Sequence, residues 1–451
     1  MSSATGQTGS RHRAPFWLRP FVAIERARGR QRLLLILIGL TVLSIPVSFI
    51  ARHLSLAGLP DVGDPFDMNE FTRSSQVPDD QNAWLVYKQA IKAFRPFDRE
   101  SAQLLRESKT ISYAKTSPEV KANLEANREA LRIWLEGTNK PDCLTTPVQN
   151  LKADPDLLEW DPVILGRLAI LEATRLMEAG DWAGAWTYLH ASLRFNLHLT
   201  RHARLTQWYW SMELTQALVP VLGRWENDPA VSAELLHQSL SDVKASSTLL
   251  GLTSDVIKLS YLATLHTLRT LYTLGSNREL GPRILDSVQA DRPNVLLFLP
   301  GGRTLYWFFK YEPERSVRLL RLVHANWLSQ CDKRSGQRAP VAPLPNALEL
   351  YDTRLDTAAQ AAARALDAAT LDGWYESSPA AQRTIEPVWP ILHQGDSVRR
   401  LLDTTRLSLA TELYRREQGQ ELEDLNELVR AGYLDALPPE YTGEPMAGGR
   451  P

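Results

Sequence analysis

Residues 33–51 form a run of nineteen amino acids, LLLILIGLTVLSIPVSFIA, in which no side chain carries a charge. At about 1.5 Å per residue, a helix over this run covers roughly 28 Å, which is close to the hydrocarbon thickness of a bilayer. A membrane helix tolerates a proline such as Pro46, because neighbouring groups satisfy the backbone that the ring leaves unpaired. The run therefore predicts one transmembrane helix in contact with the lipid bilayer.

Basic residues are concentrated on one side of this run. Residues 1–32 contain seven arginines and one acidic residue, Glu25, whereas only Arg52 and His53 follow the run closely. Because positively charged flanks stay in the cytoplasm, we expect residues 1–32 to be cytoplasmic and residues 52–451 to be exported. The sequence thus predicts a single-pass protein of the inner (cytoplasmic) membrane whose bulk is extracytoplasmic, in the periplasm.

A cleaved secretory signal is the second interpretation of the same run. Ser55 and Ala57 are small residues at the two positions that a signal peptidase reads. The apolar segment of a typical signal is about 7 to 15 residues long, so the longer run in this chain favours an uncleaved anchor. Both interpretations export the bulk of the chain.

The charge balance limits the partners of the exported part. The whole chain has a formal charge of −1 and residues 1–32 contribute +6, which leaves −7 on the remainder. A mildly acidic body has no electrostatic reason to bind nucleic acid. The hydrophobic content of 44% and the charged content of 23% are ordinary for globular proteins, so we expect this part to be folded.

The chain contains only two cysteines, Cys143 and Cys331. In an oxidising exported compartment they could form one disulfide, and their spacing leaves open whether they do. Two cysteines are too few for a cysteine-based metal cluster.

Apolar residues recur at helical spacing along almost the whole exported part, and strand-like alternation is nearly absent. We expect a mainly α-helical protein in which the transmembrane helix is followed by an extracytoplasmic array of antiparallel helical hairpins. Glycine and proline clusters divide it into a linker at 52–78, a helical body at 79–335, a proline-rich linker at 336–348, a C-terminal helical module at 349–440 and a tail at 441–451. Helices are predicted at 79–94, 117–137, 204–226, 230–243, 247–275, 313–330 and 352–371.

Three of these helices carry signals at their ends. Asp79 and Asp80 are acidic residues that suit the N-terminus of the helix at 79–94. Pro118 in the first turn and Gly137 at the end of 117–137 follow the usual asymmetry of helix termini. The serine-rich segment 245–248 lies at the start of the helix at 247–275, and we expect it to cap that helix.

The clearest structural signal is a pair of apolar stripes on either side of Gly180-Asp181, which predicts a helical hairpin at 163–201. The stripes consist of Leu165, Leu168, Ala169, Ala173 and Leu176, and of Trp182, Ala185, Trp186, Leu189 and Leu193. The run EAGDWAGAWTYLHASL at 178–193 resembles the second half of a tetratricopeptide repeat, with Gly180-Asp181 at the turn, Ala185 at the small contact position and Leu189 at the large apolar position. The resemblance covers about one repeat and implies a tetratricopeptide-like stacking of helices.

The C-terminal segment 400–446 carries a second resemblance. It is similar to the C-terminal module of membrane-anchored bacterial proteins, notably from planctomycetes, and distantly to type II secretion pseudopilins. The matching residues are Leu413-Tyr414-Arg415, Gly419, Leu425, Leu428, Tyr433-Leu434, Leu437-Pro438 and Tyr441-Thr442-Gly443. In pseudopilins the last loop helps to bind calcium, but Pro439-Glu440 stands here where those proteins have Asp-Pro, so we expect no metal site. The resemblance implies no activity.

Histidines and arginines gather at the end of the predicted hairpin. His198 and His202 are four residues apart, a spacing that can hold a metal ion from one face of a helix. The residue after His198 is leucine, so the HExxH motif is absent, and the positive charges of Arg194 and Arg201 would repel a cation. We therefore predict no metal there, and we predict that these residues with His190 form a solvated basic face that can bind a protein partner through its carboxylates.

The sequence offers no motif that identifies a reaction. GxSxG, GxxxxGK[ST] and GxGxxG are absent, and no cofactor is expected. Close pairs of acidic residues could perform acid–base catalysis, but neighbouring prolines and polar residues favour turns and helix caps instead. These pairs are Asp154 with Asp156, Glu159 with Asp161, and Glu423 with Asp424.

The sequence predicts a non-catalytic scaffold for protein–protein interaction, anchored in the membrane and facing the cell envelope, because helical arrays present broad surfaces without needing catalytic residues. The alternative is a hydrolase-like envelope enzyme whose polar residues converge only in three dimensions. A subunit of a pseudopilus-like assembly is a third possibility, against which the basic N-terminal segment and the large intervening body argue.

Overall fold

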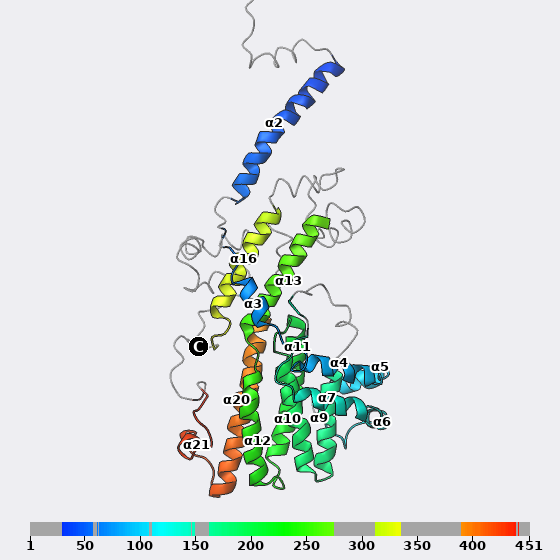
Figure 1. Cartoon of the computed structure of the whole chain (residues 1–451), viewed down its shortest axis with the longest axis vertical. Coiled ribbons are helices and arrows are strands. Elements are labelled where there is room, and N and C mark those ends of the chain that lie inside the picture. Colours follow the sequence, from blue (N-terminus) through cyan, green and yellow to red (C-terminus); the bar gives the residue numbers. More distant parts are fainter. Residues whose placement is uncertain are drawn as a thin grey trace, which may run out of the picture. The chain divides into compact units, whose positions relative to one another are not determined.

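The computed structural model describes residues 29–56, 61, 63–107, 111–145, 147–148, 162–274, 312–334, 389–438 and 441. Within these ranges every regular element is a helix (Figure 1), and one isolated bridge joins Asn82 and Asp142. The prediction of a mainly helical chain is therefore confirmed. The segment 1–28, the acidic residues at 154–161, the proline-rich linker at 336–348, the helix at 352–371 and the tail from 442 lie outside the described residues.

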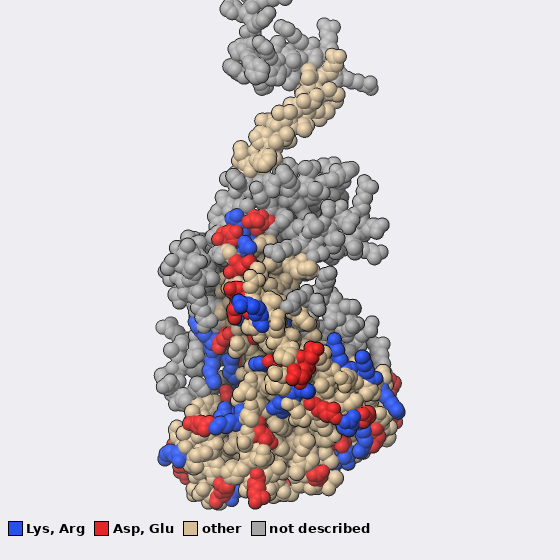
Figure 2. All heavy atoms as spheres, in the orientation of Figure 1, with Lys and Arg blue, Asp and Glu red and all other residues tan. Residues whose placement is uncertain are grey.

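Helix α2 covers Arg30–Leu56 and contains the uncharged run. Its segment Leu33–Ile50 is long and apolar enough to cross a membrane. The large apolar side chains of this segment are exposed on all sides of the helix, and Figure 2 shows no charge along it. Thr41 and Ser44 donate their hydroxyls to carbonyls of the preceding turn, at 2.8 and 2.7 Å, so these polar groups are satisfied without water.

The remaining helices, except for the first residues of α16, belong to a second compact unit that we call the helical body. Its elements are α3 (Met68–Ser74), α4 (Ala83–Ala93), α5 (Arg99–Glu107), α6 (Pro118–Ala126), α7 (Arg128–Thr138), α9 (Pro162–Glu178), α10 (Trp182–His198), α11 (Leu205–Glu226), α12 (Ala233–Ser246), the 3-10 helix η3 (Ser247–Leu249), α13 (Thr253–Leu274), α16 (Glu312–Gln330), α20 (Trp389–Gln418) and α21 (Asn426–Arg430). Charged side chains of both signs are interspersed on the face of the body seen in Figure 2.

The second half of the predicted linker at 52–78 is part of this body. Asp67 caps α3 by accepting hydrogen bonds from the amides of Asn69 and Glu70, both at 2.9 Å. Phe71 is buried, and Phe66 packs edge-on against Tyr261 of α13. These aromatic contacts explain why the glycine- and proline-rich composition of this segment does not produce a free linker.

Two predicted helices at the start of the body have different bounds in the structure. The first begins at Ala83 because the side chain of Asn82, not Asp79 or Asp80, caps it. The helix predicted at 117–137 is two helices, α6 and α7, which meet at Asn127. The buried Asn127 side chain accepts from the amide of Arg95 at 2.7 Å and donates to its carbonyl at 3.1 Å. We infer that these bonds to the backbone of Arg95 stabilise the break at Asn127 more than a continuous helix would be stabilised.

The predicted helical hairpin is present as α9 and α10, which pack along each other. Gly180 adopts a left-handed conformation with φ of 77°, which a residue without a Cβ adopts freely. Asp181 then caps α10 by accepting from the amide of Gly184 at 2.8 Å. Glycine and aspartate in this order therefore reverse the chain and start the second helix.

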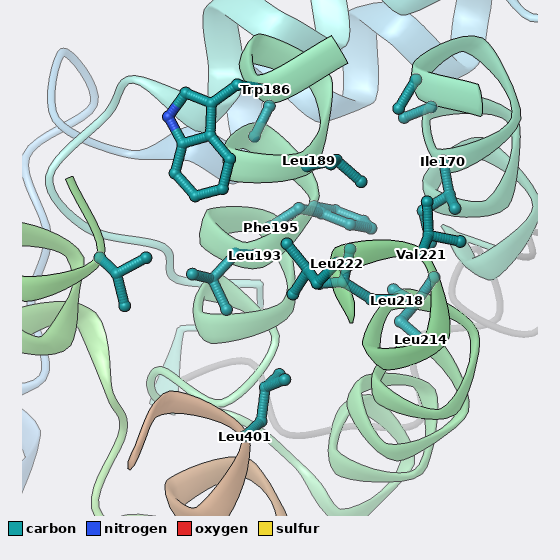
Figure 3. Close-up of a cluster of buried hydrophobic side chains, with 14 of the residues drawn as sticks. Ile170, Trp186, Leu189, Leu193, Phe195, Leu214, Leu218, Val221, Leu222 and Leu401 are labelled. Carbon is teal, nitrogen blue, oxygen red and sulfur yellow. The ribbon is translucent and has the colours of Figure 1, made fainter. Parts of the chain in front are cut away.

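The core lies where α9, α10, α11 and α20 meet. Figure 3 shows Trp186, Leu189, Leu193 and Phe195 of α10 beside Leu214, Leu218, Val221 and Leu222 of α11, with Ile170 of α9 and Leu401 of α20 completing the cluster. At about 25 cal/mol per Å² of apolar surface removed from water, such side chains supply most of the driving force for folding. Helix α20 is thus an integral wall of the core, although it is more than 160 residues from α11 in sequence.

The segment after α12 differs from its prediction. The helix expected at 247–275 is divided into η3 and α13, and the serine-rich segment does not cap it. Ser247 and Thr248 donate their hydroxyls backward, to the carbonyls of Lys244 and Ala245 at 2.6 and 3.0 Å. These groups therefore close the end of α12 instead of beginning the next helix.

The C-terminal part of the body continues from α20 into α21. Gly419, in the left-handed conformation with φ of 67°, ends α20. The carboxylate of Asp424 accepts from the amide of Asn426 at 2.9 Å, which is the turn role expected of this acidic residue. Leu428 of α21 is fully buried, so this last segment is packed against the rest of the body.

Candidate functional site

The side chains of Arg194 and His198 on α10 point toward the chain at the end of α7, not toward solvent. Arg194 donates to the carbonyls of Thr138 and Lys140, at 2.5 and 3.1 Å. Nε2 of His198 lies 3.1 Å from the same carbonyl oxygen of Lys140. The end of α10 therefore holds a segment more than fifty residues earlier in the sequence.

His198 is completely buried and bonded through both ring nitrogens. A carbonyl oxygen only accepts, so Nε2 carries the proton and Nδ1 accepts from the hydroxyl of Tyr87, which lies 2.7 Å away. Burial, together with the nearby charge of Arg194, lowers the pKa of His198 to about 3. The imidazole is thus neutral, and the expectation that His198 belongs to a solvated basic face is wrong.

Arg201 and His202 lie beyond the end of α10, which stops at His198. The guanidinium of Arg201 donates to both carboxylate oxygens of Asp142, at 3.1 and 2.8 Å. Burial alone would raise the pKa of Asp142, but the bonds from His202 and Arg201 and the charge of Arg201 hold it well below the usual range. Asp142 is therefore an ionised carboxylate under all ordinary conditions.

His202 is held between two carboxylates in a strained backbone conformation. Its φ of 43° lies in the left-handed region, which is uncommon for a residue other than glycine. Nε2 is 3.7 Å from Asp142 and Nδ1 is 4.0 Å from Asp255 of α13, with 12% of the side chain exposed. The predicted arrangement of His198 and His202 on one helical face is wrong, because the helix ends between them.

His190, the last of the predicted residues, lies on a different side of α10. Nε2 is 2.8 Å from the hydroxyl of Ser246 in α12, and the ring stacks on Trp186 with centroids 5.7 Å apart. Burial lowers the pKa of His190. The five predicted residues therefore do not form one surface, and their proposed role in binding a partner stays a prediction without support from their placement.

A second group of polar side chains joins α20 to the end of α11. We call this group the α11–α20 joint; it consists of Glu226, Ser408, Glu412 and Arg416. The Ser408 hydroxyl donates to a carboxyl oxygen of Glu226, and Arg416 donates to the Glu412 carboxylate at 2.7 Å. Burial raises the pKa of Glu226 to about 7; the bond from Ser408 lowers it and the charge of Glu412 raises it further. Such a carboxyl can exchange a proton near neutral pH.

Metal and thiol chemistry can be assessed over the described part of the chain. No group of three or more His, Cys, Asp or Glu side chains there is arranged to hold a metal ion. In particular, Asp142 and Asp255 face opposite nitrogens of His202, so these three groups do not converge on one point. Cys143 and Cys331 are both buried and form no disulfide. Burial raises the pKa of the Cys143 thiol, which makes it a poor nucleophile.

Sequence reasoning missed the partners of these groups, namely Tyr87, Asp142, Glu226 and Asp255. Tyr87 and Glu226 occupy ordinary positions in amphipathic helices, and Asp142 follows a helix as many surface turns do. No local pattern distinguishes them from other residues of their type. Their roles arise from contacts between segments that are far apart in the sequence.

Comparison with known proteins does not extend this description. The chain matches no protein-family model, no characterised protein and no solved structure. The tetratricopeptide and pseudopilin resemblances therefore stay predictions based on the residues quoted for them.

Proposed function

We propose that this protein is a non-catalytic scaffold for protein–protein interaction, anchored in the membrane by α2 and exposing its helical body on the extracytoplasmic side. The observation that carries the proposal is the surface of α2, on which large apolar side chains are exposed along the whole segment Leu33–Ile50. A helix that is apolar all round requires an apolar environment, and lipid provides it.

The orientation follows from the charges beside α2. Seven arginines precede the uncharged run and favour a cytoplasmic N-terminus, which directs the body to the periplasmic side of the inner membrane. The linker residues Asp61 and Asp64 form ion pairs with Arg321 of α16, at 2.9 and 3.2 Å. Asp61 and Asp64 thus attach the segment that follows α2 to α16 of the body.

The scaffold role is supported by how the body uses its polar groups. Arg194, His198 and Arg201 bind backbone carbonyls or a carboxylate of the chain itself, which is a structural task. Helix α10 packs against α9, α11 and α12, and helical arrays can present broad binding surfaces. We propose that this stacking is tetratricopeptide-like, in keeping with the residues at the α9–α10 turn.

Exposed apolar side chains on α11 offer the first positions at which to look for a partner. Tyr209 and Val219 are 42% and 44% exposed and lie ten residues apart on the helix. A photo-crosslinking amino acid would be placed at each position in the full chain and activated in intact membranes. Lys88, which is exposed and polar on α4, provides a matched control position.

The scaffold proposal expects one crosslinked species of defined size from Tyr209 or Val219, in high yield and absent from the Lys88 control. Mild-detergent purification should then recover the same protein in near-stoichiometric amount. If no position on the body yields a defined species, the scaffold proposal fails. Turnover of substrates by the purified protein would instead support the alternative of an envelope enzyme.

A further inference from the structure

Two buried carboxyl groups lie at the contact between α11 and α20. Glu226 is 6% exposed at the end of α11, and Glu412 is 5% exposed on α20. Ser408, Glu412 and Arg416 follow one another at intervals of four residues, so they lie on one face of α20. This face is the one that contacts the end of α11.

Glu412 is ionised, because two arginines bind its carboxylate. It accepts from Arg415 at 2.8 and 2.6 Å and from Arg416 at 2.7 Å. Although burial would raise its pKa, these two arginines lower it. Arg416 uses its other N–H groups on the carbonyls of Glu226 and Asp228, at 3.2 and 2.8 Å, and on that of Val231. Its positive charge is therefore shared between Glu412 and the α11–α12 turn.

Glu226 has a different environment. Within the described residues its carboxyl receives a single hydrogen bond, from Ser408. Ionisation of Glu226 would place a second carboxylate beside Glu412 in a site removed from water, which is strongly unfavourable because no positive group in the described part of the chain compensates the new charge. The geometry therefore favours a neutral Glu226.

We propose that α20 docks on the end of α11 with a proton held by Glu226, so that the α11–α20 joint is a pH-sensitive attachment of the C-terminal segment to the helical body. The proton is lost as the pH rises, and the negative charges of Glu226 and Glu412 then oppose each other inside the joint. Alkaline conditions loosen α20 and with it α21, which packs on α20.

The polar and charged groups around the joint come from α20, the α11–α12 turn and α12. Helix α20 contributes Glu412, Arg415 and Arg416, and the α11–α12 turn contributes the carbonyls of Asp228 and Val231. Helix α12 contributes His237, whose Nε2 lies 2.8 Å from Glu417 of α20 at the exposed edge of the contact. This outer pair is solvated, so its effect on the buried Glu226 is small.

The size of the effect follows from the two states of Glu226. Its pKa is about 7 when α20 is docked and returns to the ordinary value of 4.5 when the joint opens to water. Linkage between protonation and opening then increases the opening equilibrium constant about tenfold between pH 6 and pH 8.5. The direction is fixed, because the docked state binds more protons than the open state throughout this interval.

Hydrogen–deuterium exchange of the full chain in detergent tests the proposal. Protection factors of amides in residues 400–418, corrected for the intrinsic pH dependence of exchange, should fall about tenfold from pH 6 to pH 8.5 in the wild-type protein. The Glu226→Gln variant keeps the joint neutral and should show equal protection at both pH values. Equal protection in the wild type, or the same tenfold fall in Glu226→Gln, would overturn the proposal.

A matched control and a second measurement complete the design. Glu421→Gln removes an exposed carboxyl just after α20 and should keep the tenfold fall of the wild type; a flat response in this variant would overturn the assignment to Glu226. If Glu226→Gln does not fold, infrared spectroscopy of the wild type replaces it. A protonated-carboxyl band that disappears with a midpoint near pH 7 supports the proposal, and its absence at pH 6 contradicts it.

Discussion

At the scale of single residues, Gly137 decides how closely α4 and α7 approach. A Cβ at this position would lie 2.5 Å from Cε1 of Tyr87, and the ring cannot retreat because it is buried and its hydroxyl is bonded to His198. We expect Gly137→Ala to lower the free energy of unfolding by about 1 to 3 kcal/mol, as overpacked cores do. Urea denaturation followed by circular dichroism measures the change.

Gly223 is the matched control for this substitution. It lies inside α11, and the nearest atom to its added Cβ is 4.0 Å away. Because alanine favours a helix over glycine by roughly 1 kcal/mol, Gly223→Ala should be neutral or stabilising. Equal losses in both variants would show that the close approach of Tyr87 to Gly137 is not the cause.

Buried histidines make the stability of the body depend on pH. His198 and His324 are fully buried, and burial lowers the pKa of each to about 3, against 6.5 in an unfolded chain. Below pH 6.5 the unfolded chain therefore binds protons that the folded protein does not, and stability falls as the pH decreases. Each histidine contributes about 2 kcal/mol of this loss between pH 6.5 and pH 5.

His324→Phe isolates one of these contributions. The imidazole of His324 packs edge-on against Tyr261, and phenylalanine preserves a ring without a titrating group. The difference in unfolding free energy between pH 6.5 and pH 5 should be about 2 kcal/mol smaller in the variant than in the wild type. An unchanged pH dependence would mean that His324 is protonated in the folded protein.

The sequence predicted residue roles where the cause is local. Gly180 at the hairpin turn and Pro118 in the first turn of α6 act through backbone preferences that neighbouring residues reveal. The prediction of a solvated basic face was wrong for a different reason. Helical spacing places His198 and Arg201 on one side of a helix, but it does not reveal that α10 ends between them or that Asp142 approaches.

At the scale of elements, Arg416 fastens α20 to the turn between α11 and α12. Its side chain is 15% exposed, whereas that of Arg415, which binds the same Glu412 carboxylate, is 44% exposed. Arg416→Ala leaves three carbonyls without this donor and removes one of the two arginines that bind the buried Glu412 carboxylate, and we expect it to cost about 3 kcal/mol or more. Arg415→Ala removes a largely exposed guanidinium while Glu412 keeps its bond from Arg416, and it should cost about 1 kcal/mol or less.

Thermal or urea unfolding of the two variants measures this difference, and protease digestion locates it. Arg416→Ala should expose α20 and α21 to cleavage before the rest of the body, because their attachment is weakened. If the two variants lose equal amounts of unfolding free energy, the carbonyl contacts of Arg416 do not stabilise the joint.

Most helices of the body could be predicted, but not all of their ends. Long amphipathic patterns gave α9 to α12 and α16 to within a few residues. The division of α6 from α7 depends on the bonds of Asn127 to Arg95, and the backward bonds of Ser247 and Thr248 depend on where α12 ends. Such boundaries are decided by tertiary or competing local hydrogen bonds that no periodicity records.

At the scale of the whole molecule, the sequence identified the two parts of the chain because their requirements are so different. A run without charge requires an apolar environment, whereas amphipathic helices bury their apolar faces against other helices. The packing of α20 among α11, α12 and α13 was not predictable, since it joins segments separated by more than 110 residues. The same long-range contact creates the Glu226 site, so the site could not be predicted from the sequence either.

The central claim is that α2 crosses the membrane and places the helical body on the extracytoplasmic side. Single cysteines at Ser10 and Glu421, in otherwise unchanged chains, would be treated with a membrane-impermeant maleimide on intact cells. Both native thiols are buried, so the wild-type chain measures the background. The account predicts labelling of Glu421→Cys alone, with Ser10→Cys reacting only after the membrane is permeabilised. Labelling of Ser10→Cys in intact cells, or release of the chain from membranes by alkaline carbonate, would contradict it.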